Sequence, residues 1–240
     1  MFSVVKGFGS LFLMCCSFVL NKHKRIRSYG VLGDVPTSLK RALPLDVKAC
    51  TCISSYQKAK LKISAPMAFK KYGISPQYLP VPPKDKLKGG FVTAAVELGN
   101  YIEPIRTIDP EFVSYPKGKN SVKYTLIMID FDRHMGPAPN VHLIAIFVNV
   151  PNSKNLMIGG EEAVPFISPV PNIGTGIHRI AGILYEQNDH IDPNQMEFLK
   201  LTKSRVLHLA EFVKTYNLKP EPVAGTFYTT ELKRCGNFKH

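Results

Sequence analysis

The stretch 174–187, G-T-G-I-H-R-I-A-G-I-L-Y-E-Q, most constrains how this chain can fold. Two glycines one residue apart make a tight bend without side chains, and an apolar run follows directly. The pattern predicts a bend that delivers His178 and Arg179 to the lip of a buried strand. Two further runs rich in Val, Ile, Leu and Phe, 122–130 and 142–150, each carry a polar residue at one end. Three such strands predict one core with polar ends, where any chemistry should gather.

Charge is divided unevenly along the chain. Residues 1–90 hold 16 Lys and Arg against 3 acidic residues, whereas residues 91–240 hold 15 of each kind, so the net charge of +13 belongs to the N-terminal part. A basic extension on a neutral domain is a common means of binding nucleic acid or an anionic surface. The 240 residues, 45% of them apolar, suffice for one sizeable domain or for a domain of about 150 residues plus an extension.

The first 33 residues have the composition of a leader. They contain no acid, five Lys or Arg, and an apolar run at 8–20. This run is too short to span a bilayer comfortably, so no stable membrane insertion is expected. An acid-free basic leader favours import into the mitochondrial matrix; a secreted protein and an uncleaved basic tail on a cytoplasmic protein stay open as alternatives.

The segment 34–88 is expected to be a basic, partly helical extension that ends in a proline-rich linker. Prolines at 76, 80, 82 and 83 predict an extended, docked chain over 73–90. Before them, lysines alternate with aromatic residues, which suits RNA because rings stack on bases while lysines meet phosphates. The candidate RNA contacts are Tyr56, Lys58, Lys60, Lys62, Lys70, Lys71 and Tyr72. The alternative is a solvated basic helix whose aromatic rings pack on the domain.

Six pieces of the sequence, taken in order, resemble the phosphatidylethanolamine-binding protein family. They are L-G-N-Y-I-E-P (98–104), D-P-E-F-V-S-Y (109–115), Y-T-L-I-M-I-D-F-D (124–132), His142 leading into V-N-V-P, G-T-G-I-H-R with L-Y-E-Q, and V-A-G-T-F-Y (223–228). The segment P-F-I-S-P-V-P (165–171) and K-Y-G-I-S (71–75) look more like the member of this family in the large subunit of the mitochondrial ribosome. The resemblance implies a mainly β domain over 89–234, an antiparallel β-sandwich with a few peripheral helices, followed by a tail at 235–240.

The resemblance also implies a small pocket that binds anions such as phosphate groups. Its polar wall matches Asp130, Asp132, His142 and His178. Two carboxylates at alternate positions of a strand end are expected on the same side of the strand. A histidine donates to phosphate oxygens, and an aspartate behind it fixes its tautomer.

This chain departs from the family at the rim of that pocket. Ser168, Val170 and Asn172 stand where two glycines and a proline usually shape the rim, and bulky Val170 would tend to fill the site. A degenerate pocket is therefore favoured, in which Asp130 and His178 hydrogen-bond each other. Retained anion binding is the alternative, and Arg179 is expected to form a salt bridge with one of the acids.

Catalysis, metals and cofactors are not expected. The D-F-D at 130–132 invites acid/base or metal chemistry together with the histidines, but no nucleophile motif, phosphate loop or third carboxylate at suitable spacing accompanies it. The five cysteines, at 15, 16, 50, 52 and 235, form neither a disulfide framework nor a paired zinc motif.

Three functions of different classes follow. The favoured one is a structural protein of the mitochondrial large ribosomal subunit, whose β domain docks on the particle while the basic extension contacts rRNA or neighbouring ribosomal proteins. The second is a soluble regulator that binds a phospholipid headgroup or other anion and inhibits a kinase or protease. The third is an enzyme that uses Asp130 and His178 for hydrolysis.

Overall fold

The structure is a computed structural model that describes residues 63–137 and 139–233. The chain divides into two units, Met1–Thr37 and Ser38–His240, and all the described residues belong to the second. The predicted leader, the 235–240 tail and four candidate RNA contacts, namely Tyr56, Lys58, Lys60 and Lys62, lie outside the described residues.

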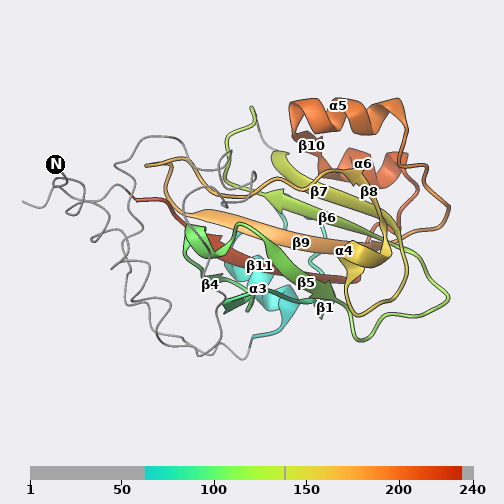
Figure 1. The fold of residues 1–240 in the computed structure, drawn as a ribbon, viewed down its shortest axis with the longest axis horizontal. Helices are drawn as coiled ribbons and strands as arrows, with labels where there is room; N and C mark the ends of the chain where they lie inside the picture. Colours follow the sequence, from blue (N-terminus) through green and yellow to red (C-terminus); the bar gives the residue numbers. More distant parts are fainter. Residues whose placement is uncertain (1–62, 138, 234–240) are drawn as a thin grey trace, which may run out of the picture. The chain divides into compact units, whose positions relative to one another are not determined.

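A central eight-stranded sheet dominates the described part (Figure 1). Its path is β1-β11-β9-β6-β7-β10, with β4 also paired to β11 and β8 to β7; β1 and β4 run parallel to β11 and the other neighbours are antiparallel. The strands are β1 (Asp85–Lys86), β4 (Asn100–Tyr101), β6 (Tyr124–Asp130), β7 (Asn140–Val150), β8 (Glu161–Val164), β9 (His178–Glu186), β10 (Val206–His208) and β11 (Ala224–Thr230).

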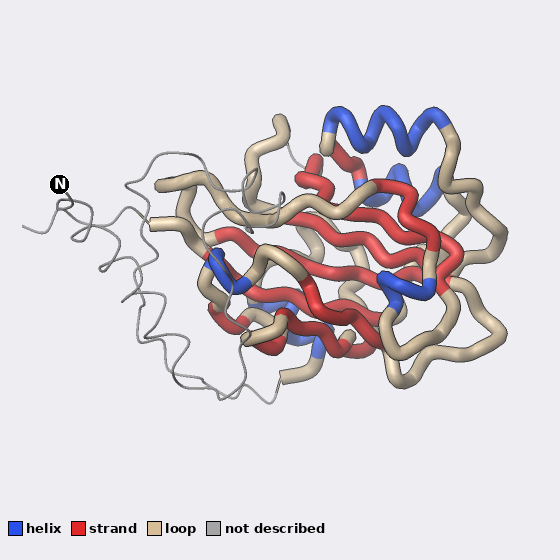
Figure 2. Tube along the Cα trace, in the orientation of Figure 1, coloured by secondary structure: helices blue, strands red, loops and turns tan. Residues whose placement is uncertain are grey.

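A smaller sheet and a few helices complete the fold. The small sheet has the order β3-β2-β5, formed by β2 (Lys88–Phe91), β3 (Ala94–Ala95) and β5 (Pro110–Ser114). The helices are α3 (Ala65–Lys71), the 3-10 helix η1 (Pro104–Arg106), α4 (Leu156–Gly159), α5 (Met196–Ser204) and α6 (Leu209–Thr215) (Figure 2). None of the helices in the described ranges is both long and apolar enough to cross a membrane. The predicted mainly β fold with a few peripheral helices is confirmed.

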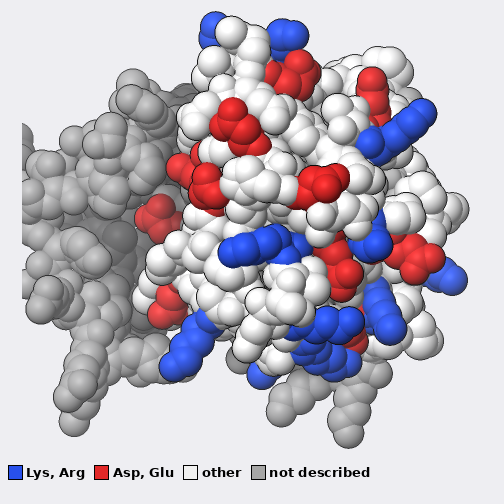
Figure 3. All heavy atoms as spheres, turned by 90° about the vertical axis from the view of Figure 1, so that its right-hand side faces the viewer, with Lys and Arg blue, Asp and Glu red and all other residues white. Residues whose placement is uncertain are grey.

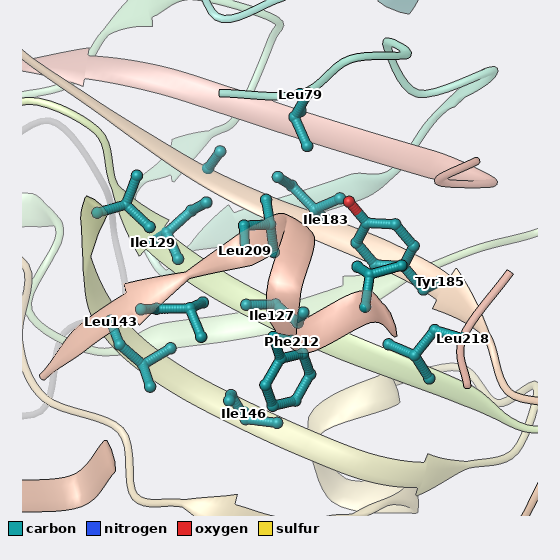
Figure 4. Close-up of a cluster of buried hydrophobic side chains, with 14 of the residues drawn as sticks. Leu79, Ile127, Ile129, Leu143, Ile146, Ile183, Tyr185, Leu209, Phe212 and Leu218 are labelled. Atoms are coloured by element: carbon teal, nitrogen blue, oxygen red, sulfur yellow. The ribbon is translucent and has the colours of Figure 1, made fainter. Parts of the chain in front are cut away.

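Both faces of the central sheet are buried, which explains why its strands are almost wholly apolar. All seven residues of β6 are buried, and they alternate between two clusters because successive side chains point to opposite faces. Ile127 and Ile129 join a cluster that includes α3 and α6, whereas Leu126 and Met128 join residues of the small sheet. Figure 4 shows the first cluster, in which side chains of β6, β7, β9 and α6 meet.

The folded body begins earlier than the predicted boundary at Gly89. Phe69 of α3 is fully buried, and its ring meets Phe227 of β11 edge to face at 4.9 Å between centroids. Ile74 and Leu79 are buried in the same cluster. Because α3 covers part of one face of the central sheet and Ile63 packs against the same cluster, the folded domain includes residues 63–88.

This packing generates a test of the boundary. Phe69→Ala should lower the free energy of unfolding by about 3 to 5 kcal/mol, the cost of a large cavity in a core. Met67→Ala on the same helix should change it by less than about 0.5 kcal/mol, because Met67 is 62% exposed. Urea unfolding of the full-length chain measures both. Equal, small losses would show that α3 is not part of the core.

Candidate functional site

Four polar side chains meet at one end of the central sheet, where β6 and β11 end and β7 and β9 begin. The pairing register sets Asp130 opposite His142 on one side and Ile180 on the other, and Thr230 opposite His178. Directly paired residues share a face of the sheet, and so do residues two positions apart in one strand, such as His178 and Ile180. The side chains of Asp130, His142, His178 and Thr230 therefore all lie on the face that the small sheet covers. The strand ends therefore bring together Asp130, His142 and His178, as predicted.

Asp130 and His178 form a closed pair. The Nδ1 atom of His178 lies 2.7 Å from Oδ2 of Asp130, and its Nε2 atom lies 2.7 Å from the hydroxyl of Thr175. The other carboxylate oxygen of Asp130 accepts the backbone N–H groups of Asp132 and Arg133 at 2.9 and 3.1 Å. The side chains of His178 and Asp130 are only 2% and 3% exposed. Both ring nitrogens and both carboxylate oxygens are thus engaged within the protein, and the expected hydrogen bond between Asp130 and His178 is present.

His142 lies beside this pair without joining it. It is 6% exposed, and its Nδ1 atom has no hydrogen-bond partner among the described residues. Burial, with a smaller contribution from the nearby Arg133, lowers the pKa of His142 from 6.5 to about 4. The ring is therefore neutral at pH 7. The hydroxyls of Ser168 and Thr230 are likewise buried and unpartnered within the described part.

The segment 165–171 is held against β7 and the apolar residues near the end of β11. The N–H of Ile167 donates to the carbonyl of Ile144 in β7, and just beyond the segment the N–H of Gly174 donates to the carbonyl of Leu232 after β11. Val170 is buried in a small apolar cluster with Ile108 and Leu232. This is the residue that the sequence predicted to occupy the rim, and here it packs as core.

Asp132 does not belong to this site, which corrects the prediction that both carboxylates lie on one side. Strand β6 ends at Asp130, and the chain bends at once through the two backbone bonds to that carboxylate. The carboxylate of Asp132 instead receives Nε and Nη2 of Arg179 at 2.8 and 2.7 Å, and the backbone N–H of Arg179 at 2.7 Å. Because Arg179 follows His178 in β9, the two side chains point to opposite faces.

Arg179 ties α3 to the sheet, a role that sequence reasoning missed in part. Its predicted salt bridge to an acid is present, and its Nη1 also donates to the carbonyl of Tyr72 at 2.6 Å. The guanidinium stands over the ring of Tyr78, 5.8 Å from the centroid. The hydrogen bonds that Arg179 donates to the Asp132 carboxylate raise the pKa of Arg179. A pocket of about 290 Å³ opens here, lined by Tyr72, Gly99, Asp132, Ile177, Arg179 and Thr229.

Only three of the candidate RNA contacts fall within the described residues. Lys70 and Lys71 are exposed at the end of α3. The ring of Tyr72 packs against Phe227 at 5.0 Å, and its hydroxyl donates to the carbonyl of Gly99. Tyr72 therefore has a packing role, as the alternative of a helix docked through its aromatic rings predicted, and it is not free to stack on a base.

A metal centre finds no support in the described ranges. No group of three or more His, Cys, Asp or Glu side chains there lies so as to hold a metal ion. With its carboxylate and imidazole engaged by neighbours, the Asp130–His178 pair cross-links two strand ends.

Comparisons with known proteins identify the fold. No model of a protein family matches the sequence. The structure is similar to that of a carboxypeptidase Y inhibitor complexed with its cognate proteinase, with a TM-score of 0.55 and 18% identity over 72% of this chain and 98% of that one. It is also similar to phosphatidylethanolamine-binding proteins from Plasmodium falciparum (TM-score 0.53, 16% identity, 73% and 100% of the two chains) and Plasmodium vivax (0.50, 16%, 70% and 98%). The fold is that of the phosphatidylethanolamine-binding proteins.

The buried state of His142 predicts a pH dependence of stability. Between pH 6.5 and about 4 the unfolded chain binds a proton at this residue and the folded chain does not, so stability falls as the pH falls through this window. Urea unfolding should show that His142 alone makes the protein about 2 kcal/mol less stable at pH 5 than at pH 7. His142→Gln should remove that part of the pH dependence. An unchanged pH profile in the variant would mean that the ring is solvated.

The Arg179–Asp132 pair predicts a geometric requirement. Arg179→Lys keeps the charge but loses the fork that binds both carboxylate oxygens and the Tyr72 carbonyl, so it should cost about 1 to 3 kcal/mol of unfolding free energy. Arg106→Lys is the matched control, because Arg106 makes one exposed hydrogen bond to Thr93, and it should cost less than about 0.5 kcal/mol. Equal costs in urea unfolding would contradict this role of Arg179.

Proposed function

We propose that this chain is a non-enzymatic structural protein of the mitochondrial large ribosomal subunit. The folded domain is the docking body, and the basic N-terminal extension binds rRNA or neighbouring ribosomal proteins. Import into the mitochondrial matrix through the acid-free leader is part of the proposal. The observation that carries it is the closed Asp130–His178 pair, because a site for a headgroup or a substrate must present polar atoms that are free to bind it.

The segment 165–171 supports the same proposal. Residues 165–171, P-F-I-S-P-V-P, carry the resemblance to the ribosomal member of the family. Val170 of this segment is buried in an apolar cluster with Ile108 and Leu232, so its side chain is engaged in packing.

The charge distribution supports the assignment of RNA to the extension. Residues 1–90 carry all of the excess of 13 positive charges, as 16 basic residues less 3 acidic ones. Each lysine that meets a phosphate releases a counterion, so such an extension binds RNA strongly at low salt and weakly at high salt. Residues 91–240 have no net charge, so in this proposal the shape of the folded domain and the attached basic extension hold it on the particle.

A second function, an anion-binding regulator, has one observation in its favour. His142 Nδ1 and the hydroxyl of Thr230 are buried beside the Asp130–His178 pair without hydrogen-bond partners in the described part. Polar atoms of this kind are satisfied when a small anion or water binds them. Proteins of this fold include a proteinase inhibitor and phosphatidylethanolamine-binding proteins. Phosphate and phosphoethanolamine are the probes for this alternative.

Gradient sedimentation of the tagged full-length protein from organelle lysate, at low and at raised salt, tests the proposal. The protein should migrate with the large subunit at both salts. A slowly sedimenting protein at both salts, combined with saturable phosphoethanolamine binding that His178→Ala abolishes, would replace the ribosomal proposal with the regulator.

The extension is tested in the same gradient. Charge reversal of Lys58, Lys60 and Lys62 to Glu should abolish association with the particle, because it replaces three phosphate-binding charges with repelling ones. The same reversal at the exposed lysines 200, 203 and 214 is the matched control and should leave association intact. Circular dichroism checks that both variants are folded. If the Lys58, Lys60 and Lys62 variant still sediments with the large subunit, these lysines are not needed for binding and the proposed RNA contact of the extension is contradicted.

A further inference from the structure

Two loops at the end of the central sheet opposite the Asp130–His178 site carry lysines without acids. The loop 115–123 joins β5 to β6 and contains Lys117, Lys119 and Lys123, and the segment 151–155 follows β7 and contains Lys154. All four lysines are exposed. Neither segment contains Asp or Glu. We call these four lysines the basic loop surface.

The two loops are fixed to each other. The amide of Asn152 donates to the carbonyl of Gly118 at 2.9 Å and to the side chain of Asn120 at 3.1 Å. The N–H of Lys119 donates to the buried hydroxyl of Tyr124 at 2.8 Å. A Cβ atom at Gly118 would lie 2.5 Å from the Asn152 side chain, so the close approach of the loops depends on glycine. The lysines therefore stand on a preformed surface.

Most of this charge is not neutralised within the described residues. Lys117 pairs with Asp85 at 2.5 Å, whereas Lys119, Lys123 and Lys154 form no ion pair in the described part of the chain. The acids of the adjoining segments are Asp85, which is already paired, and Glu111, Glu161, Glu186 and Asp189. Figure 3 views this end of the molecule, where Lys and Arg in the lower half of the view lie beside several Asp and Glu.

We propose that the basic loop surface binds the phosphate backbone of a structured RNA. The proposal rests on the proposed function, which makes rRNA the partner, and it adds an RNA contact on the folded domain itself. Lysine ammonium groups on a fixed surface suit phosphates, and the exposed Asn120 and Ser121 between them can donate to phosphate or ribose oxygens. The exposed residues of 115–123 include no aromatic or large aliphatic side chain, which a membrane-binding loop would use.

The experiment compares two triple variants of the full-length chain. One is Lys119→Gln, Lys123→Gln and Lys154→Gln; the matched control is Lys200→Gln, Lys203→Gln and Lys214→Gln, which removes the same charge from exposed positions on α5 and α6. Fluorescence anisotropy measures binding to a 20-base-pair RNA hairpin over a salt series. The logarithm of the RNA association constant falls linearly with the logarithm of the salt concentration, and each lost phosphate contact makes this fall less steep. The magnitude of the slope should therefore decrease by about 2 to 3 in the first variant and by less than about 1 in the control. Equal slopes would overturn the proposal.

Two further measurements assign the outcome. In the organelle gradient, the first variant should dissociate from the large subunit at a lower salt concentration than the control does. If the unmodified protein never sediments with the subunit, the proposed function fails. The salt dependence of hairpin binding then still shows whether the basic loop surface binds RNA. Vesicles of phosphatidylcholine and phosphatidylserine at 3:1 test the other anionic partner. A variant that loses vesicle binding but keeps the RNA slope of the control would assign the surface to membranes and overturn the proposal.

Discussion

The alternation of side chains across β9 is the constraint on which this end of the molecule depends. His178 and Arg179 are consecutive residues of one strand, so they point to opposite faces of the central sheet. Each takes one carboxylate of the D-F-D sequence that ends β6: Asp130 bonds to His178 on one face, and Asp132 bonds to Arg179 on the other. The adjacent ends of two central strands are thus joined from both faces. Arg179 also donates a hydrogen bond to the carbonyl of Tyr72, directly after α3, and so attaches this helix to the central sheet.

The neighbours of the Asp130–His178 pair occupy the atoms that acid–base chemistry would use. An imidazole next to a carboxylate can act as a base when its second nitrogen is free to reach a substrate. Here that nitrogen meets Thr175, and the carboxylate accepts two backbone N–H groups. Because each polar atom of the Asp130–His178 pair is hydrogen-bonded, the pair links the end of β6 firmly to the start of β9. The buried, neutral His142 is the one polar group of the original prediction that remains unpartnered within the described part.

Much of this could be predicted from the sequence, and the errors have physical causes. The glycine bend and the apolar run after it located β9, and the bonds Asp130–His178 and Arg179 to an acid were both expected and are present. The placement of Asp132 was wrong because alternation holds only while a strand continues, and the carboxylate of Asp130 bends the chain immediately. The boundary at Gly89 was too late because α3 is short, with only three of its seven residues buried, and its burial depends on Phe69 meeting Phe227 across the fold. Long-range contacts of that kind leave no periodic signal in the sequence.

The two ends of the central sheet have different consequences for docking. The Asp130–His178 end buries its polar pair near an apolar cluster around Val170, and the opposite end presents the basic loop surface on loops that Asn152 holds together. The basic extension joins the folded domain through α3, which Arg179 anchors. Under the proposed function, the extension and the basic loop surface would be two RNA contacts of one chain, and the first contact would set a high effective concentration for the second. The two proposed contacts therefore reinforce each other when the chain between them can span both binding sites.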